Sequence, residues 1–167
     1  MKMKRPILLA SLAACLAWTG CDNSETPVAK GDGPAAAVAG DAAEWLTDFS
    51  AAQAKAKADS KRIFLDFTGS DWCSACKAIK KKVLTSAEFA AYAKTALVLV
   101  EVDFPMNHPQ PDALKAANKT LSDRFKIDGY PTLVVTDADG KELWREEGYD
   151  DETPAQYVAK LKAIKPK

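Results

Sequence analysis

From residue 41 onwards, the chain alternates between apolar residues at helical spacing and short, nearly continuous apolar runs. The apolar runs predict four strands, at 63–67, 97–102, 133–136 and 142–146. The last two strands flank residues 137–140, which read as a hairpin turn. The helical spacing predicts five helices, at about 41–58 with Asp41 as N-cap, at 74–84, from Thr85 through Tyr92, at 114–125, and after Thr153 with Pro154 in the first turn.

Strands that alternate with helices and end in a hairpin indicate an α/β protein. We therefore expect a central mixed β-sheet flanked by helices on both faces. The strand at 97–102 is almost entirely apolar, so both of its faces should be covered. Thr85 and Glu88 have the spacing of a capping box, which predicts the start of the third helix.

Composition places the chain among globular proteins. It has 167 residues, of which 47% are apolar and 28% charged, values that exclude collagen, wholesale disorder and a multi-span membrane protein. Three basic residues and no acidic residue fall in the first 20 positions, so the remainder carries 20 basic and 23 acidic side chains, a net charge of −3. A weakly acidic domain lacks the positive surface that nucleic-acid binding requires, so we expect no nucleic-acid partner.

The basic residues belong to an N-terminal leader. Residues 1–5 include Lys2, Lys4 and Arg5, and residues 7–18 are apolar or small over a length too short to span about 30 Å of hydrocarbon. The leader resembles a bacterial lipoprotein signal, in which cleavage precedes a cysteine that becomes lipidated. This resemblance predicts a lipoprotein-type signal peptide at 1–20.

Two cysteines compete for lipidation in this leader. Cys15 follows a sequence that fits the lipoprotein box, whereas Cys21 has Trp18 at the position where an aliphatic residue is usual. Cys21 is favoured because a polar stretch with little large apolar surface follows it, and this stretch predicts a flexible linker at 21–40. An ordinary secretory signal is the alternative. Both interpretations place the domain outside the cytoplasm.

The second pair of cysteines, Cys73 and Cys76, follows a predicted strand and begins a predicted helix. Two intervening residues put the sulfur atoms within reach of a disulfide. At the helix N-terminus, free amide groups and the helix dipole stabilise a thiolate, which predicts a lowered pKa for Cys73 and makes it the attacking sulfur. Cys76, one turn later, would resolve a mixed disulfide. A permanently closed structural disulfide is the alternative.

Other uses of a cysteine pair fit these residues less well. A structural zinc site needs about four ligands, and the domain offers the two thiolates and His108. A c-type haem needs a histidine directly after the second cysteine, where Lys77 stands. A soft-metal site, such as one that binds or delivers Cu(I), remains the second hypothesis, with Met106 and His108 as further ligands.

Three segments carry a resemblance to the thioredoxin superfamily: residues 65–67, 72–77 and 129–132, which read Leu-Asp-Phe, Trp-Cys-Ser-Ala-Cys-Lys and Gly-Tyr-Pro-Thr. The second segment is especially similar to the periplasmic reductase domain of DsbD. The resemblance implies a thioredoxin fold, for which we assign residues 41–167.

The resemblance also implies roles for single residues. Pro131 would be cis, and the backbone of Tyr130 before it would bind an extended substrate beside Cys73, with Trp72 at the rim. Asp66 would be a buried acid that accepts a proton from Cys76. Because this chain has one extra residue between Asp66 and the cysteines, Asp71 is a second candidate acid.

Taken together, these features predict a membrane-tethered, extracytoplasmic thiol-disulfide oxidoreductase in a bacterial cell envelope, on the periplasmic side. We expect it to act on protein disulfides in the reductase or isomerase direction and to receive electrons from an upstream thiol redox partner. No cofactor and no metal are expected, because the cysteine pair itself carries the electrons. We also expect a monomer.

Overall fold

The computed structural model describes residues 43–165. The predictions for the leader, for Cys15 and Cys21 and for the linker at 21–40 lie outside the described residues. None of the helices in the described part of the chain is both long and apolar enough to span a membrane.

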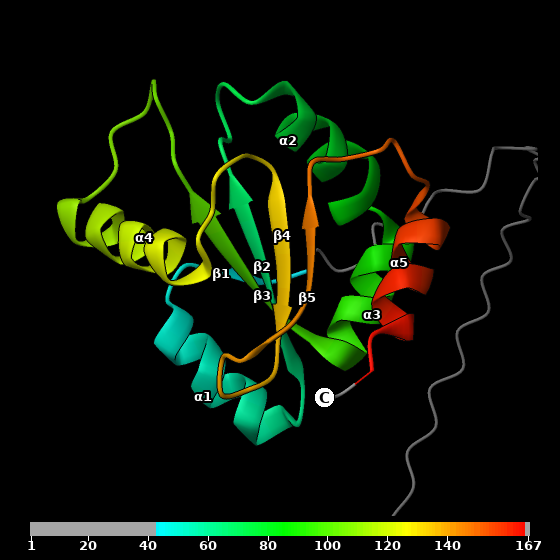
Figure 1. Cartoon of the computed structure of the whole chain (residues 1–167). Helices are drawn as coiled ribbons and strands as arrows, with labels where there is room; N and C mark the ends of the chain where they lie inside the picture. The colour runs from blue at the N-terminus through cyan, green and yellow to red at the C-terminus, as the bar shows by residue number, and fades with distance from the viewer. Residues whose placement is uncertain (1–42, 166–167) are drawn as a thin grey trace, which may run out of the picture. The chain divides into compact units, whose positions relative to one another are not determined.

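Strands and helices alternate along the described residues, as the sequence predicts (Figure 1). The order is β1 Trp45–Leu46, α1 Phe49–Asp59, β2 Arg62–Thr68, α2 Ser74–Ile79, the π-helical segment η1 Lys80–Leu84, α3 Ala87–Ala96, β3 Leu97–Asp103, α4 Asp112–Phe125, β4 Thr132–Thr136, β5 Glu142–Glu147 and α5 Pro154–Ala163.

The five strands form one mixed sheet in the order β1-β3-β2-β4-β5. β1 and β2 each pair with β3 in parallel, and β4 runs antiparallel to both β2 and β5. The expected mixed sheet of the α/β class is therefore confirmed. In the β4–β5 connection, Gly140 has a φ of +83°, a left-handed conformation that glycine adopts without steric cost.

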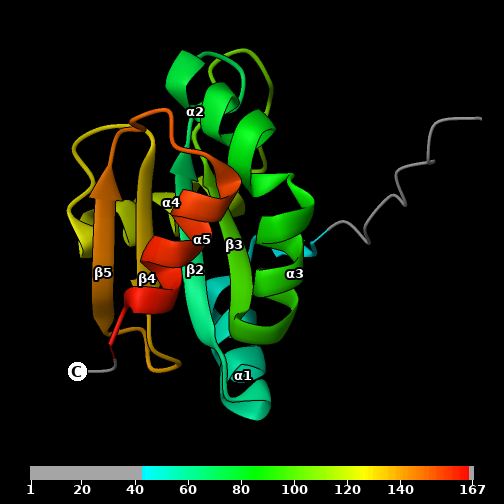
Figure 2. The same cartoon turned by 90° about the vertical axis from the view of Figure 1, so that its right-hand side faces the viewer.

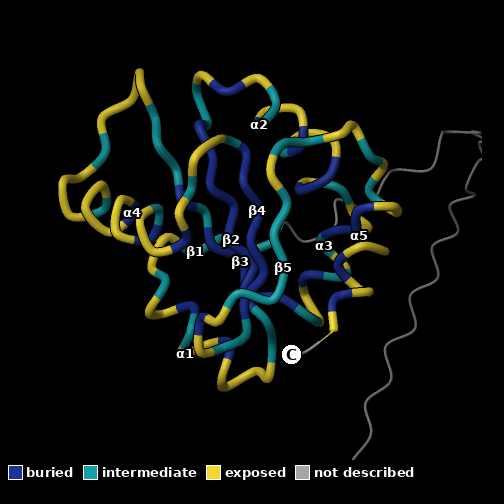
Figure 3. The backbone as a smooth tube through the Cα atoms, viewed as in Figure 1, coloured by how far each residue is buried: buried dark blue, intermediate teal, exposed yellow. Residues whose placement is uncertain are grey.

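Helices lie on both sides of the sheet (Figure 2), and its central strands are mostly buried (Figure 3). Alternating side chains of these strands contribute to two separate hydrophobic cores. On β2, Phe64 points into the core formed with η1, α3 and α5, whereas Ile63, Leu65 and Phe67 point into the core formed with α1 and α4. Helices thus cover both faces of the sheet, as predicted. By the same alternation, Asp66 points to the face that η1, α3 and α5 cover.

The prediction for the first helix is wrong at its start. Trp45 and Leu46 do not belong to the helix but form β1, where they pair with Leu99 and Val100 of β3. The helix begins at Phe49, and its N-cap is Asp48, whose side chain accepts from the amides of Ser50 and Ala51. The apolar residues at 45 and 46 have helical spacing relative to Phe49, but pairing with a distant strand determines their conformation.

The predicted helix at 74–84 is present, but it changes from α-helical to π-helical geometry at Lys80. The next helix is capped one residue later than predicted. Ser86 accepts from the amide of Phe89, while the hydroxyl of Thr85 donates to the carbonyl of Lys81. The capping box predicted for Thr85 and Glu88 is therefore wrong.

Three connections meet at one end of the sheet (Figure 1). They are the turn from β2 into α2, the loop from β3 into α4, and the loop from α4 into β4. The first carries Cys73 and the third carries Pro131. The predicted redox cysteines and the predicted substrate-binding segment therefore lie at the same end of the sheet.

Candidate active site

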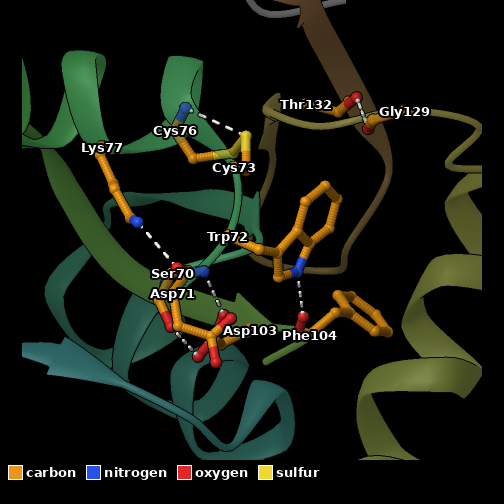
Figure 4. The surroundings of a disulfide bond; sticks show 10 residues. All are labelled: Ser70, Asp71, Trp72, Cys73, Cys76, Lys77, Asp103, Phe104, Gly129 and Thr132. Carbon is orange, nitrogen blue, oxygen red and sulfur yellow. Dashed lines mark hydrogen bonds between the residues drawn. A yellow bond between two sulfur atoms is a disulfide. The ribbon is translucent and has the colours of Figure 1, made fainter. Parts of the chain in front are cut away.

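A disulfide joins Cys73 and Cys76 at the start of α2 (Figure 4). The two Cα atoms are 5.3 Å apart and the S–S distance is 2.07 Å. Cys73 is the N-cap of α2, and its Sγ accepts from the amide of Cys76 at 3.1 Å. Cys73 is 6% exposed and Cys76 2%, so the leading cysteine is the more exposed of the two residues.

The turn before the disulfide is built on Gly69. Its carbonyl accepts from the amide of Cys73 at 2.9 Å, which closes the turn at the helix start. The indole of Trp72 packs so closely over Gly69 that a Cβ at this position would lie 2.4 Å from Trp72 Cε2. Only glycine leaves room for the ring there.

Trp72 joins two other aromatic residues beside the disulfide. Its Nε1 donates to the carbonyl of Phe104 at 2.8 Å (Figure 4). Its ring meets Tyr130 edge-on, with the ring centroids 5.7 Å apart. Phe104 also contacts Tyr130, at a centroid distance of 5.3 Å. The structure therefore places Trp72 beside the Tyr130–Pro131 segment, and 39% of its surface stays exposed.

The peptide bond between Tyr130 and Pro131 is cis, as the resemblance implies. Pro131 is buried, and its carbonyl accepts from the amide of Gly148 at 2.8 Å. The hydroxyl of Thr132 donates to the carbonyl of Gly129 across the bend. These bonds hold the segment on both sides of the proline.

Asp71, the second candidate acid, is held by hydrogen-bond donors from the β3–α4 loop. Its carboxylate accepts from the amide of Met106 at 3.0 Å and from the amide of Asn107 at 2.6 Å, and His108 Nδ1 lies 3.1 Å from Oδ2. The Met106 amide is the largest influence that lowers the pKa of Asp71, to about 2. A carboxylate held ionised in this way is poorly suited to accept a proton at neutral pH.

Asp66, in contrast to Asp71, lies in an environment that raises its pKa. It is 2% exposed, and its Oδ1 has no hydrogen-bond partner within the described part of the chain. Burial, followed by the negative charge of Glu101, raises the pKa of Asp66 to about 7, although the positive charge of Lys80 acts in the opposite direction. Of the two candidate acids, Asp66 is the one that changes protonation near neutral pH.

Sequence reasoning missed the charged pair beside Asp66. Glu101 lies opposite Asp66 in the pairing of β2 with β3, and Lys80 Nζ is 2.5 Å from Glu101 Oε2. In the sequence, Lys80 is one of four lysines in the predicted helix at 74–84, a pattern that by itself indicates only a solvent-exposed helix face. Lys77, on the same face, donates to the carbonyl of Asp71 at 2.7 Å. No periodicity in the sequence signals these partners, because strand register and the π-helical segment bring them together.

The residues considered for a soft-metal site are spread over this surface. Met106 is 74% exposed, and the His108 ring nitrogen nearest to the turn faces Asp71. Within residues 43–165, no group of three or more histidine, cysteine, aspartate or glutamate side chains is arranged to hold a metal ion. Cys21, the predicted lipidation site, lies outside the described residues.

Comparison with known proteins gives a consistent result. Residues 49–165 match the thioredoxin-like domain family. The disulfide bond reductase DsbH of Chlamydia pneumoniae is 40% identical over 120 residues, which cover 72% of this chain and 71% of that protein. A solved structure of a DsbH oxidoreductase superposes with a TM-score of 0.71 at 35% identity, covering 81% of this chain and 93% of the other.

The similarity to DsbD covers a smaller part of a longer protein. The thiol:disulfide interchange protein DsbD of Vibrio cholerae is 34% identical over 97 residues, which are 58% of this chain but 14% of that protein.

Proposed function

This chain belongs to the thioredoxin-like family and is a thiol-disulfide oxidoreductase, and we propose that it reduces protein disulfides through Cys73 and Cys76. The observation that carries the proposal is the disulfide at the start of α2, next to the cis Tyr130–Pro131 bond. The 40% identical relative named a disulfide bond reductase supports the reductase direction over the isomerase direction.

The reaction begins with reduced Cys73 and Cys76. The Cys73 thiolate attacks one sulfur of the substrate disulfide, the substrate S–S bond breaks, and the other substrate sulfur leaves as a thiolate. The Cys76 thiolate then attacks Cys73 Sγ in the mixed disulfide and releases the second substrate thiolate. The substrate gains two electrons and, with two protons, becomes a dithiol, while the protein reaches the oxidised Cys73–Cys76 state that the structure contains.

The geometry gives the two sulfurs different tasks. The amide of Cys76 points at Cys73 Sγ and would stabilise negative charge there in the reduced protein. Cys76 is the more buried of the two cysteines, and its thiol must lose a proton before it can attack. Asp66 points to the face that η1, α3 and α5 cover, where its raised pKa suits it to accept that proton.

Substrate binding is assigned to Trp72, Tyr130 and Pro131. Cys73 is almost fully buried, so a substrate sulfur has to enter between the exposed edge of Trp72 and the Tyr130–Pro131 backbone. An extended polypeptide fits this approach better than a globular surface, because the backbone of Tyr130 can pair with it. An upstream dithiol protein would return the oxidised pair to the reduced form. The protein would act as a monomer.

The same proposal includes an extracytoplasmic location at the bacterial envelope. The leader at 1–20 and the polar stretch at 21–40 support export and a lipid tether at Cys21. Mass spectrometry of the mature protein from its native membrane tests this, because the expected N-terminal peptide begins with a diacylglyceryl-modified Cys21. Recovery of an unmodified N-terminus, or one that begins at Cys15, would contradict the assignment.

Insulin reduction with dithiothreitol as electron donor tests the activity. Wild-type protein should accelerate the reaction, and Cys73→Ser should lower the rate by at least about a hundredfold, because the attacking sulfur is lost. Cys76→Ser should accumulate a mixed disulfide between Cys73 and insulin, visible by non-reducing electrophoresis. A Cys73→Ser variant as active as wild type would rule the mechanism out.

A further inference from the structure

The exposed large hydrophobic residues of the described chain gather at one place. They are Trp72, at 39% exposure, and Met106, at 74%. Trp72 lies in the turn before Cys73, and Met106 lies in the β3–α4 loop, more than thirty residues further along the chain. Both loops emerge at the end of the sheet where the disulfide lies (Figure 1).

Three sets of hydrogen bonds fasten the β3–α4 loop to the turn that carries Trp72. At the base of the loop, Asp103 accepts from the amide of Ser70 at 2.9 Å and from its hydroxyl at 2.6 Å. Next, the carbonyl of Phe104 accepts from the Trp72 indole. Finally, the Asp71 carboxylate accepts from the amides of Met106 and Asn107 and contacts the ring of His108. Figure 4 shows the first two of these attachments beneath the disulfide.

Asp71 is the centre of this arrangement. Its side chain is only 7% exposed, and the backbone amides of Met106 and Asn107 both point at it. Because consecutive amides of this loop donate to one carboxylate, the loop backbone is fixed and its side chains have defined positions. The side chain of Met106 is therefore held out into solvent on a fixed backbone next to the active site.

We infer that residues 104–108 form a second wall of the substrate-binding surface, on which Met106 contacts the substrate polypeptide and Asp71 is the residue that positions the loop. The inference rests on the proposed function. An exposed methionine is costly in water and adapts its shape to many apolar partners, which suits a surface that receives different sequences. The first wall consists of Trp72, Tyr130 and Pro131. Phe104 connects the two walls, because its ring contacts Tyr130 and its carbonyl accepts the hydrogen bond from Trp72.

The occupant is the polypeptide that flanks the attacked cysteine in an oxidised protein substrate. Its sulfur must reach Cys73 past Trp72, and the residues next to that sulfur then cross either the Tyr130–Pro131 segment or the loop with Met106. A small disulfide reaches Cys73 without spanning this distance. Substitutions in the second wall should therefore change KM for protein disulfides and leave KM for small disulfides unchanged.

Steady-state kinetics with two substrates test this inference. Turnover is measured with insulin and with glutathione disulfide at a fixed concentration of dithiothreitol, which returns the protein to its reduced form, and the uncatalysed rate is subtracted. Met106→Ala should raise KM for insulin by about fivefold, as expected for loss of one apolar contact, while the change with glutathione disulfide stays below twofold. Met106→Leu should restore most of the insulin KM. Lys141→Ala is the control, because Lys141 is exposed in the β4–β5 connection, at the opposite end of the sheet from the disulfide.

A second measurement tests the role of Asp71. Asp71→Asn should raise KM for insulin with little change in kcat, because it loosens the loop and leaves the sulfur chemistry in place. The double variant Asp71→Asn with Met106→Ala should be no worse than the more affected single variant, since both act through the same contact. Additive losses would overturn the positioning role.

The outcomes separate this inference from the proposed function. Wild-type turnover of glutathione disulfide tests the oxidoreductase activity itself. If that activity is present and Met106→Ala changes both substrates equally, or neither, the second wall is wrong while the activity stands. If Met106→Ala instead abolishes self-association in sedimentation experiments, the surface receives a second copy of this chain and the inference is overturned.

Discussion

Asp66 and Glu101 lie directly opposite each other in the parallel pairing of β2 with β3, so two carboxyl groups share one face of the sheet. The same row continues across the sheet through Leu133 of β4 to Glu146 of β5. Lys80 binds Glu101 at one end of the row, and Lys160 binds Glu146 at the other. Asp66 is the buried carboxyl between them, and its environment keeps it protonated to an unusually high pH.

This environment makes the stability of the oxidised protein depend on Asp66. The pKa is about 7 in the folded state and 3.8 for an unperturbed aspartate, so between these values the folded state holds a proton that the unfolded state has lost. The free energy of unfolding should therefore fall as the pH rises from about 4 to about 7, by an amount on the order of 4 kcal/mol. Asp66→Asn should remove this fall.

Urea denaturation of the disulfide-bonded protein between pH 4 and pH 9 measures the effect. The informative quantity is the difference between Asp66→Asn and wild type as a function of pH, which cancels contributions from other groups. That difference should move in favour of the variant as the pH rises. A difference that stays constant across this range would show that Asp66 is ionised throughout.

Glu101 and Lys80 should shift the protonation of Asp66 in opposite directions. Glu101→Gln removes a negative charge and should lower the pKa of Asp66, whereas Lys80→Met removes a positive charge and should raise it. The Asp66 carboxyl carbon signal, followed by NMR during a pH titration, reports both shifts. Lys81→Met is the matched control, because Lys81 is the next residue and is solvent exposed. Equal midpoints in all four proteins would contradict the pairing.

Gly69→Ala should displace Trp72. The added Cβ would lie 2.4 Å from Cε2 and 2.6 Å from Cζ2 of a rigid ring, so the indole has to move away from the Phe104 carbonyl that it binds. Overpacking of this kind costs about 1–3 kcal/mol. The tryptophan emission, to which Trp72 is one of four contributors, and the melting temperature both report the change.

Gly129→Ala serves as the control for the glycine substitution, since no atom lies within 4 Å of a Cβ built there. It should change the melting temperature far less. An unchanged tryptophan emission in Gly69→Ala would mean that the backbone at residue 69, and not the ring, yields to the new methyl group.

The reduction potential of the Cys73–Cys76 pair should be that of a reductant. Thioredoxin lies near −270 mV and the strong oxidant DsbA near −120 mV, and we expect a value closer to the former, on the order of −270 mV. The Ser-Ala dipeptide between the cysteines and the similarity to DsbH support this expectation. Equilibration with dithiothreitol redox buffers measures the potential. A value near that of DsbA would reverse the proposed direction.

The sequence predicted well those features that depend on neighbouring residues. Helix α5 begins as predicted, with Thr153 as N-cap and Pro154 in the first turn, and Gln156 completes a capping box. The two-residue strand β1 could not be predicted in this way. Trp45 and Leu46 carry helical spacing, and their strand conformation comes from Leu99 and Val100, more than fifty residues away.

The reactive centre shows the same division. The spacing of Cys73 and Cys76, the strand before them and the helix after them were sufficient to predict a redox pair, because two cysteines on one helical turn are close whatever the rest of the chain does. The choice between Asp66 and Asp71 required tertiary structure. Strand register places Glu101 beside the first, and a loop more than thirty residues away supplies amide donors to the second. A carboxyl group's protonation depends on burial and on nearby charges, and these depend on how distant segments pack.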